Sequence, residues 1–255
     1  MYRRTTFAPA LLLATTLTAT LAMAQPATNL RTTGLPPIPK LEVRRATTKI
    51  AIDGKLTEEA WRTADHVTFQ FPWNEQKGAR QKTTARLLWD ELYLYIAYDC
   101  EDMDITAQFE KRDDPTYRDD AVEAFINPNP AQTDVYIGLE MNARAVLYDY
   151  VYFGSRYLLK RLNLEGVQLA THINGTLNAR GDKDQGWTLE LAIPFTEFEG
   201  LNAGKTPNPG DTWTINLNRW DGVEPERRHS LWSDSALVNP NPHNAKRFGS
   251  MVFVK

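Results

Sequence analysis

The chain has 255 residues, of which 42% are hydrophobic and 24% charged, and its formal net charge is −3. This length suits one sizeable β domain or two small domains. The chain is mildly acidic and has no lysine or arginine run, which excludes the basic surface that binds nucleic acid or anionic membranes. Cys100 is the single cysteine, so an intrachain disulfide and a metal site built from cysteines are also excluded.

The first 24 residues have the pattern of an export signal. Arg3 and Arg4 precede an apolar, threonine-rich stretch that ends in Ala22-Met23-Ala24. This order predicts a secretory signal peptide that is cleaved after Ala24. A membrane anchor is disfavoured, because the stretch is only about 18 residues long and is interrupted by threonines. We therefore expect a secreted or periplasmic protein that has no integral membrane segment after signal cleavage. We also expect the protein to be a monomer.

Residues 25–40, QPATNLRTTGLPPIPK, contain four prolines and lack an apolar period. This composition indicates a linker, or a tail that lies along the surface of the domain that follows over residues 41–255. Within that domain the segment LTEEAWRTA, residues 56–64, is the best candidate for a helix because two glutamates lie in its first turn.

Beyond residue 48 the apolar residues recur mostly with a period of two, as is typical of β-strands. The runs TTARLLWD and LYLYIAYDC are joined by a tight turn and predict a hairpin. Further runs are DAVEAFI, DVYIGLEMN, AVLYDYVYF, GVQLATHI, GWTLELAIP, DTWTINLNRW, RHSLWSD and FGSMVFV. Many short strands separated by turn residues predict an all-β fold, either an antiparallel sandwich or a barrel.

Several of these strands combine an apolar face with a face of amides, carboxylates and aromatic rings. Glu140 and Asn142 share a face of one predicted strand, and Asn218 and Trp220 share a face of another. Such groups bond sugar hydroxyls and pack against sugar rings, although a solvated outer sheet would show the same pattern. Glu123 lies in mid-strand, where a carboxylate is costly unless something bonds to it. It could be a structural ion-pair partner, a catalytic acid or a ligand-binding group.

Blocks along the chain resemble family 9 carbohydrate-binding modules, a group within the DOMON-like sandwiches. The blocks are IDGKLTEEAW, LLWDELYLYIAYDCED, DDAVEAFINP, GWTLELAIPF, PGDTWTINLNRW, LWSD and HNAKRFGSMVF, in this order from about Ile52 to the C-terminus. The resemblance implies an antiparallel two-sheet β-sandwich, jelly-roll-like, here with one short helix. It also implies binding to the ends of plant polysaccharide chains, and structural calcium in some members.

The resemblance assigns roles to individual residues. Tyr117 and Trp232 match the two aromatic residues that sandwich a terminal sugar, and Glu123 and Asn142 match residues that bond its hydroxyls. The family carries an arginine where this chain has Glu140, so an anion replaces a cation beside Glu123.

Three more residues are expected near the same site. Asn218 and Trp220 would extend the aromatic platform. His243 matches a histidine before the closing FG of the family and would line the cleft or cap a loop.

Two other functions remain open. Glu123 and Glu140 could form a glycosidase pair, which requires carboxylates about 5 to 10 Å apart across an open cleft. Haem is a second alternative because DOMON-like relatives bind it through methionine, histidine or lysine. Met141 and His172 would be its ligands here, but Met141 has the parity of a core residue and the chain has no C-x-x-C-H motif.

A structural calcium ion is a weaker prediction. Asp99, Asp102 and Asp104 lie close together in DCEDMD, and calcium prefers several converging carboxylates. The four histidines are scattered without the spacing of a zinc site. The sequence as a whole predicts a secreted, non-catalytic protein that binds a glycan or oligosaccharide end and aids polysaccharide breakdown beside glycoside hydrolases.

Overall fold

The computed structural model describes residues 30–154, 157–159, 163–201 and 206–255, so the predicted signal peptide lies outside the described residues. The fold is all-β, as the sequence predicts. The α-helix among the described residues is α1 (Glu59–Thr63), within the segment predicted to be helical. The fully described 3-10 turns are η1 (Thr116–Arg118), η3 (Phe195–Leu201) and η4 (Ala245–Arg247).

Most strands follow the runs that the sequence marks, but the strands at residues 40–45, 66–68 and 157–159 lie outside them. The strands are β1 (Lys40–Arg45), β2 (His66–Thr68), β3 (Thr83–Trp89), β4 (Tyr93–Glu101), β5 (Ala121–Asn127), β6 (Val135–Asn142), β7 (Leu147–Phe153), β8 (Tyr157–Leu159), β9 (Gln168–Asn174), β10 (Gly186–Pro194), β11 (Thr212–Asp221), β12 (Arg228–Leu231) and β13 (Gly249–Phe253).

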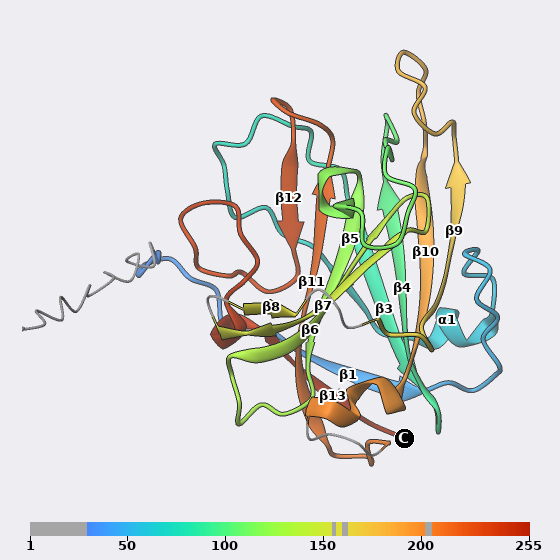
Figure 1. Cartoon of the computed structure of the whole chain (residues 1–255), viewed down its shortest axis with the longest axis vertical. Helices are drawn as coiled ribbons and strands as arrows, with labels where there is room; N and C mark the ends of the chain where they lie inside the picture. The colour runs from blue at the N-terminus through green and yellow to red at the C-terminus, as the bar shows by residue number, and fades with distance from the viewer. Residues whose placement is uncertain (1–29, 155–156, 160–162, 202–205) are drawn as a thin grey trace, which may run out of the picture.

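Hydrogen bonds link these strands into one curled sheet instead of the two separate sheets that were expected. Its order is β8-β7-β6-β5-β11-β13-β1-β3-β4-β10-β9, with β12 beside β11 and β2 beside β3. Strand β1 joins the half of the sheet that ends at β13 to the half that begins at β3. It pairs with β13 over residues 40–43 and with β3 through residues 44–45, and it lies below the upright strands in Figure 1. Both pairings of β1 are parallel, so the prediction of a purely antiparallel fold is wrong at this strand.

The main core lies between the two halves that β1 connects. Side chains alternate along a strand, so every second residue of β5, β6 and β11 enters this core, where they join β3, β4 and β10. The Tyr98 hydroxyl of β4 donates to the Glu123 carbonyl of β5 at 2.9 Å and so bonds the halves across the core. Met141 is fully buried in the same core, as its parity predicted.

The helix α1 packs on the outer side of the β3–β4–β10 half. Trp61 is buried there, and its indole N–H donates to Glu190 of β10 at 2.7 Å. Glu190 also accepts the backbone N–H groups of Asp53 and Gly54. Gly54 has φ +83° and a Cβ there would lie 2.5 Å from the Thr171 backbone, so this turn requires glycine.

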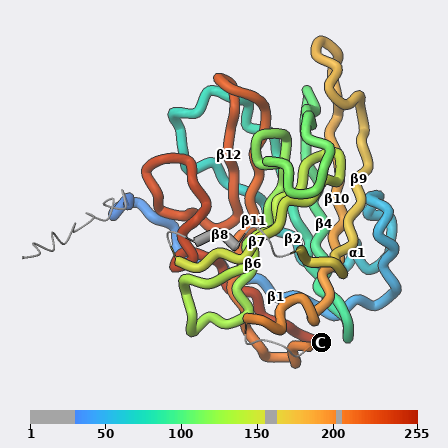
Figure 2. The backbone as a smooth tube through the Cα atoms, in the orientation of Figure 1, coloured from blue at the N-terminus to red at the C-terminus, as the bar shows by residue number. Residues whose placement is uncertain are grey.

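The long loop between β2 and β3 covers β12, as Figure 2 shows at the upper left. Gln70 and Leu231 exchange backbone hydrogen bonds of 2.9 and 3.1 Å. Arg228 donates to the Gly78 and Gln76 carbonyls of this loop. These contacts hold the β11–β12 hairpin against the rest of the fold.

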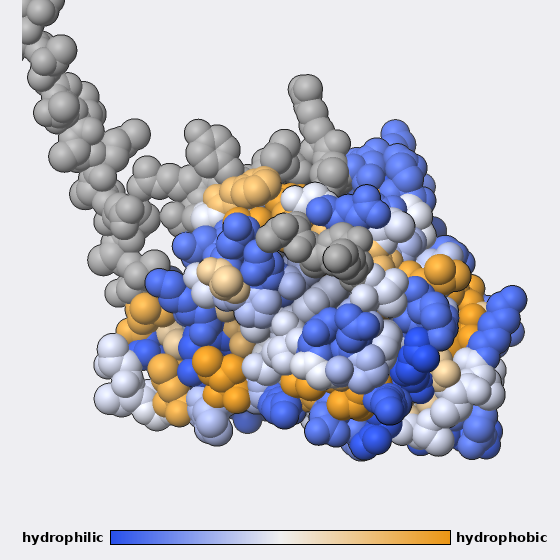
Figure 3. Space-filling model, turned by 90° about the horizontal axis from the view of Figure 1, so that it is seen from below, coloured by the Kyte–Doolittle hydropathy of each residue, from blue (hydrophilic) through white to orange (hydrophobic). Residues whose placement is uncertain are grey.

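Residues 30–39, the described part of the predicted linker, lie along the domain. Leu30 forms a β-bridge with Leu237, and Arg31 forms an ion pair with Asp234. On the face drawn in Figure 3, hydrophobic groups are scattered among hydrophilic ones. Among the described residues, no helix is long and apolar enough to cross a bilayer.

Candidate functional site

The outward faces of β5, β6, β11 and β12 carry a row of polar side chains. Glu123 pairs with Glu140 on one side and with Asn218 on the other, because β5 lies between β6 and β11. Two residues further along β11, Trp220 pairs with His229 of β12. Together with Arg227, which precedes β12, these residues form a group that we call the Glu123 cluster: Glu123, Glu140, Asn218, Trp220, Arg227 and His229.

Glu123 is only 2% exposed, and its Oε2 atom has no hydrogen-bond partner among the described residues. Burial raises the pKa of Glu123 well above its usual value, and the neighbouring Glu140 raises it further. Arg227, Trp220 and Asn218 act in the opposite direction, because a cation and hydrogen-bonding groups favour the carboxylate. The chain thus surrounds Glu123 with polar groups without satisfying both of its oxygens.

Tyrosines of β7 border the cluster on the Glu140 side. The Tyr150 hydroxyl donates to Glu140 Oε1 at 2.9 Å. Its ring lies over Gly138 of β6, where a Cβ would come within 2.2 Å of it. Tyr148 pairs with Glu140 across the strands, and its ring meets that of Tyr117 edge-on at 5.8 Å. Because residue 138 is a glycine, the Tyr150 ring can pack over β6, and its hydroxyl can bond the carboxyl group of Glu140.

Stacked rings support the other side of the cluster. His229 stacks against Trp220 at 4.0 Å and against Trp73 of the β2–β3 loop at 5.0 Å. Burial lowers the pKa of His229 well below its usual value, so the ring is neutral at pH 7. The guanidinium of Arg227 lies 4.6 Å from the Trp220 ring centre. Because Trp220 packs against both His229 and Arg227, its position suits support of Arg227 better than stacking on a sugar.

Arg227 brings a positive charge to the cluster. Its guanidinium donates to the Tyr117 carbonyl and, at 3.5 Å, to the Asp119 carbonyl. Burial lowers the pKa of Arg227, while the charge of Glu123 raises it. An arginine stays charged in proteins even so. Its Nε atom is buried and has no hydrogen-bond partner among the described residues.

The structure places Asn142 in a turn-forming role. Its amide nitrogen donates to the Phe109 carbonyl and to Asp119, and its oxygen accepts the backbone N–H groups of Arg144 and Val146. Both polar atoms of this fully buried side chain are thus used within the protein: the oxygen holds the β6–β7 turn, and the nitrogen ties it to the segment before β5.

The other predicted aromatic residues are separated. Tyr117 lies half-buried at the edge of the Glu123 cluster, whereas Trp232 is 7% exposed and packs in the main core with its ring against Gly249. His243 lies further along the same sheet face, stacked on Phe125 at 4.8 Å.

His243 also lines a hollow of its own. Its Nδ1 atom and the Tyr136 hydroxyl are 2.6 Å apart, and Tyr152, Asn244 and Lys246 complete that side of the hollow. Burial lowers the pKa of His243 to about 4, which leaves the ring neutral at pH 7.

Sequence reasoning did not identify Arg227, His229 or the β7 tyrosines as part of the site. The sequence pattern could have indicated His229 and the β7 tyrosines. The hairpin register from Trp220 across the turn points to His229, and the alternation in LYDYVYF puts Tyr148 and Tyr150 on one face. Arg227 lies in the loop before β12, where strand parity carries no information.

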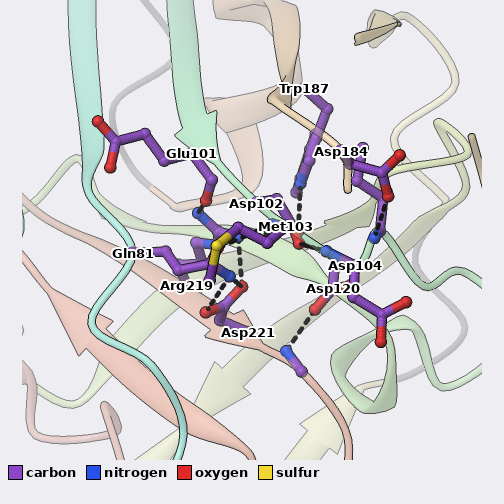
Figure 4. A network of polar contacts seen from close by, with 12 residues as sticks. Gln81, Glu101, Asp102, Met103, Asp104, Asp120, Asp184, Trp187, Arg219 and Asp221 are labelled. Carbon is purple, nitrogen blue, oxygen red and sulfur yellow. Dashed lines mark hydrogen bonds and ion pairs between the residues drawn. The ribbon is translucent and has the colours of Figure 1, made fainter. Parts of the chain in front are cut away.

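Of the three aspartates that the sequence suggested, Asp102 alone lies in the acidic group that the described residues form. Asp99 and Asp104 are exposed, and the carboxylate group among the described residues is formed by Asp102, Asp120 and Asp221. Figure 4 shows Arg219 among them, donating to Asp102 at 2.9 Å and also to Asp221.

The oxygens of this acidic group are already used. Asp120 accepts two backbone N–H groups, Asp102 accepts the Trp187 indole N–H and a backbone N–H, and Asp221 accepts the Gln81 amide. Burial raises the pKa of Asp102 to about 6, and the Arg219 guanidinium opposes this rise. The arrangement fits a network centred on a guanidinium, and a calcium ion would have to displace Arg219 from it.

The geometry argues against the glycosidase alternative. Glu123 and Glu140 are side by side on adjacent strands, and they are 2% and 4% exposed. A glycosidase pair instead flanks the scissile bond from two sides of an open cleft.

Comparison with known proteins identifies the family. The family model for carbohydrate family 9 binding domain-like proteins matches residues 52–255. Curated relatives include Exoglucanase XynX of Acetivibrio thermocellus, 29% identical over 151 residues, and Endo-1,4-beta-xylanase C of Paenibacillus barcinonensis, 26% identical over 206 residues. The matches cover 59% and 80% of this chain but only 12% and 16% of those enzymes.

Solved structures share the fold. A crystal structure of a Bacteroides uniformis protein matches with TM-score 0.72 and 16% identity, over 84% of this chain and 99% of that one. A family 9 module of Caldicellulosiruptor kristjanssonii matches in its cellotriose complex with TM-score 0.58 and 16% identity, over 84% and 93% of the two chains. Its glucose complex matches with TM-score 0.57 and 15% identity, over 83% and 95%. This chain therefore belongs to the carbohydrate family 9 binding domain-like family.

Proposed function

We propose that the protein binds the end of a neutral sugar chain at the Glu123 cluster and performs no catalysis itself. The observation that carries this proposal is a concentration of buried polar atoms without hydrogen-bond partners. Among the described residues, such atoms include Glu123 Oε2, Arg227 Nε and both ring nitrogens of His229.

Leaving buried polar groups without partners is costly, and native proteins contain few of them. Here the groups belong to residues of β5, of β12 and of the loop before β12, and β11 lies between β5 and β12. They include an acceptor on Glu123 and a donor on Arg227, and a sugar hydroxyl can satisfy both kinds because it donates and accepts. The rings of Tyr117 and Tyr148 beside them add flat apolar surface of the kind that packs against sugar C–H groups.

The relatives support this ligand class. The Caldicellulosiruptor kristjanssonii module was solved with cellotriose and with glucose, and the curated relatives are an exoglucanase and a xylanase. On this basis the ligand is an end of a β-linked plant polysaccharide, and the protein acts beside hydrolases that degrade it.

Isothermal titration of the exported protein with glucose, cellobiose and xylobiose tests the proposal. We expect saturable binding by the wild type and a loss of about tenfold or more in Glu123→Gln, which replaces a carboxyl oxygen with an amide nitrogen but keeps the shape. Glu42→Gln, at an exposed position of β1, is the matched control and should bind like the wild type. Failure of the wild type to bind any sugar would reject the proposal, as would unchanged binding by Glu123→Gln.

Export is a second part of the proposal, and it depends on residues 1–24. Sequencing the N-terminus of the protein recovered from the periplasm or the medium should give Gln25 as the first residue. Recovery of the uncut chain in the cytoplasm alone would contradict this.

A further inference from the structure

We propose that Arg227 is a ligand-binding residue that determines specificity at this site, reading a sugar hydroxyl together with Glu123. This inference rests on the proposed function, because it specifies how the Glu123 cluster would hold its sugar. The loop before β12 supplies the residue, and its support comes from the rings of Trp220, His229 and Trp73.

Charge and position both point to Arg227. Glu123 and Arg227 attract one another electrostatically, but the described side chains form no direct ion pair. Glu123 Oε2 and Arg227 Nε are both buried and lack partners. A hydroxyl group between them would donate to the carboxylate and accept from the guanidinium, so a single ligand group would satisfy both atoms.

The same charges select the class of ligand. A uronic acid or another anionic sugar would meet the carboxyl groups of Glu123 and Glu140, which are cross-strand neighbours. An amino sugar would meet the guanidinium of Arg227. A neutral sugar avoids both repulsions, and two adjacent hydroxyls suit the planar fork of arginine better than the single ammonium of lysine.

The structure also explains why Arg227 can be held ready for a ligand. One of its nitrogens is tied to the Tyr117 and Asp119 carbonyls, while its plane lies over Trp220. Trp220 is in turn packed against His229, and His229 against Trp73. A long side chain that is already ordered loses less conformational freedom when the sugar binds.

The test combines variants of Arg227 with altered sugars. Wild type, Arg227→Ala and Arg227→Lys would be titrated with glucose and with its 2-, 3-, 4- and 6-deoxy analogues at pH 7. Arg62→Ala, which removes an exposed arginine from α1, is the charge-matched control. Circular dichroism and thermal unfolding would establish that each variant is folded.

We expect Arg227→Ala to weaken glucose binding about tenfold or more, and Arg227→Lys to weaken it by a smaller factor. At least one deoxy analogue should bind the wild type more weakly than glucose and lose this difference in Arg227→Ala. A residue that only supports the fold would not produce that coupling. Arg62→Ala should bind like the wild type.

The outcomes separate the two proposals. If the wild type binds glucose and folded Arg227→Ala binds within about twofold of it, Arg227 is not a ligand-binding residue and the proposed function stands. If every deoxy penalty persists in Arg227→Ala, the assignment of a hydroxyl to Arg227 is overturned. If the wild type binds no sugar at all, both proposals are rejected together.

Discussion

The two halves of the molecule each bury a glutamate in the middle of a strand, and the two residues are treated in opposite ways. Glu190 of β10 accepts the N–H groups of Asp53, Gly54 and Trp61 at 2.9, 2.7 and 2.7 Å. Glu123 of β5 lies beside a second carboxyl group and retains an oxygen without a partner.

This difference in hydrogen bonding distinguishes Glu190, a structural carboxylate, from Glu123, which we propose is available to a ligand. Burial raises the pKa of both groups. At Glu190 the hydrogen bonds from Asp53, Gly54 and Trp61 act against that rise. Glu123 keeps one oxygen without a partner among the described residues, and we propose that a ligand bonds it. A binding site that is built this way costs stability in the free protein, and several substitutions can measure the cost.

Replacing Glu190 should cause the largest change. Glu190→Leu leaves two backbone N–H groups and the Trp61 indole N–H buried without an acceptor. We expect a loss of about 3 kcal/mol or more in the free energy of unfolding, measured by urea denaturation. Sugar affinity, measured on the folded fraction, should not change, and a stable Glu190→Leu protein would contradict the structural role.

Gly138→Ala should have an intermediate effect. The added methyl group overlaps the Tyr150 ring and must displace the hydroxyl that donates to Glu140. We expect a loss of about 1 to 3 kcal/mol, as for other overpacked sites, together with weaker sugar binding. The control is Gly200→Ala, where a methyl group meets no atom within 4 Å. Equal effects at the two positions would show that Tyr150 does not hold the Glu140 side chain in place.

Glu123→Gln should change stability less, and in the opposite direction from Glu190→Leu. The amide replaces a buried carboxyl group whose pKa is raised by desolvation and by Glu140. We expect a gain of about 1 kcal/mol at pH 7 to 8, together with the weaker sugar binding expected above. Destabilisation by this variant would make Glu123 a structural residue like Glu190.

The smallest effect is a dependence of that gain on pH. In the unfolded chain glutamate titrates near pH 4.3, whereas folded Glu123 keeps its proton to higher pH because its pKa is raised. Between these two pKa values the folded state binds more protons, so its stability falls as pH rises. The stability difference between Glu123→Gln and wild type should therefore widen from about pH 4.5 upward. Parallel stability profiles of the two proteins between pH 4.5 and 8 would argue against a raised pKa.

Much of this arrangement can be predicted from the sequence. A period of two marks the strands, and parity alone puts Glu123, Asn218 and Trp220 on the outward face of β5 and β11. The all-β class and the short helix around Trp61 follow from the same kind of pattern.

The remainder depends on contacts between distant segments. Parity cannot reveal that the amide of Asn142 is used by a turn, or that Trp232 packs in the core. The acidic group around Arg219 joins residues 102, 120 and 221, which no local spacing suggests. Arg227 comes close to Glu123 because β12 pairs with β11 and β11 pairs with β5, so that the loop before β12 meets the Tyr117 and Asp119 carbonyls just before β5.

The most direct test of a sugar site at Glu123 is a crystal structure of the protein grown with glucose or cellobiose. The account predicts an ordered sugar ring beside Tyr117, with one hydroxyl within hydrogen-bonding distance of both Glu123 and Arg227. A sugar bound elsewhere, for example in the hollow beside His243 and Tyr152, with Glu123 and Arg227 untouched, would contradict it.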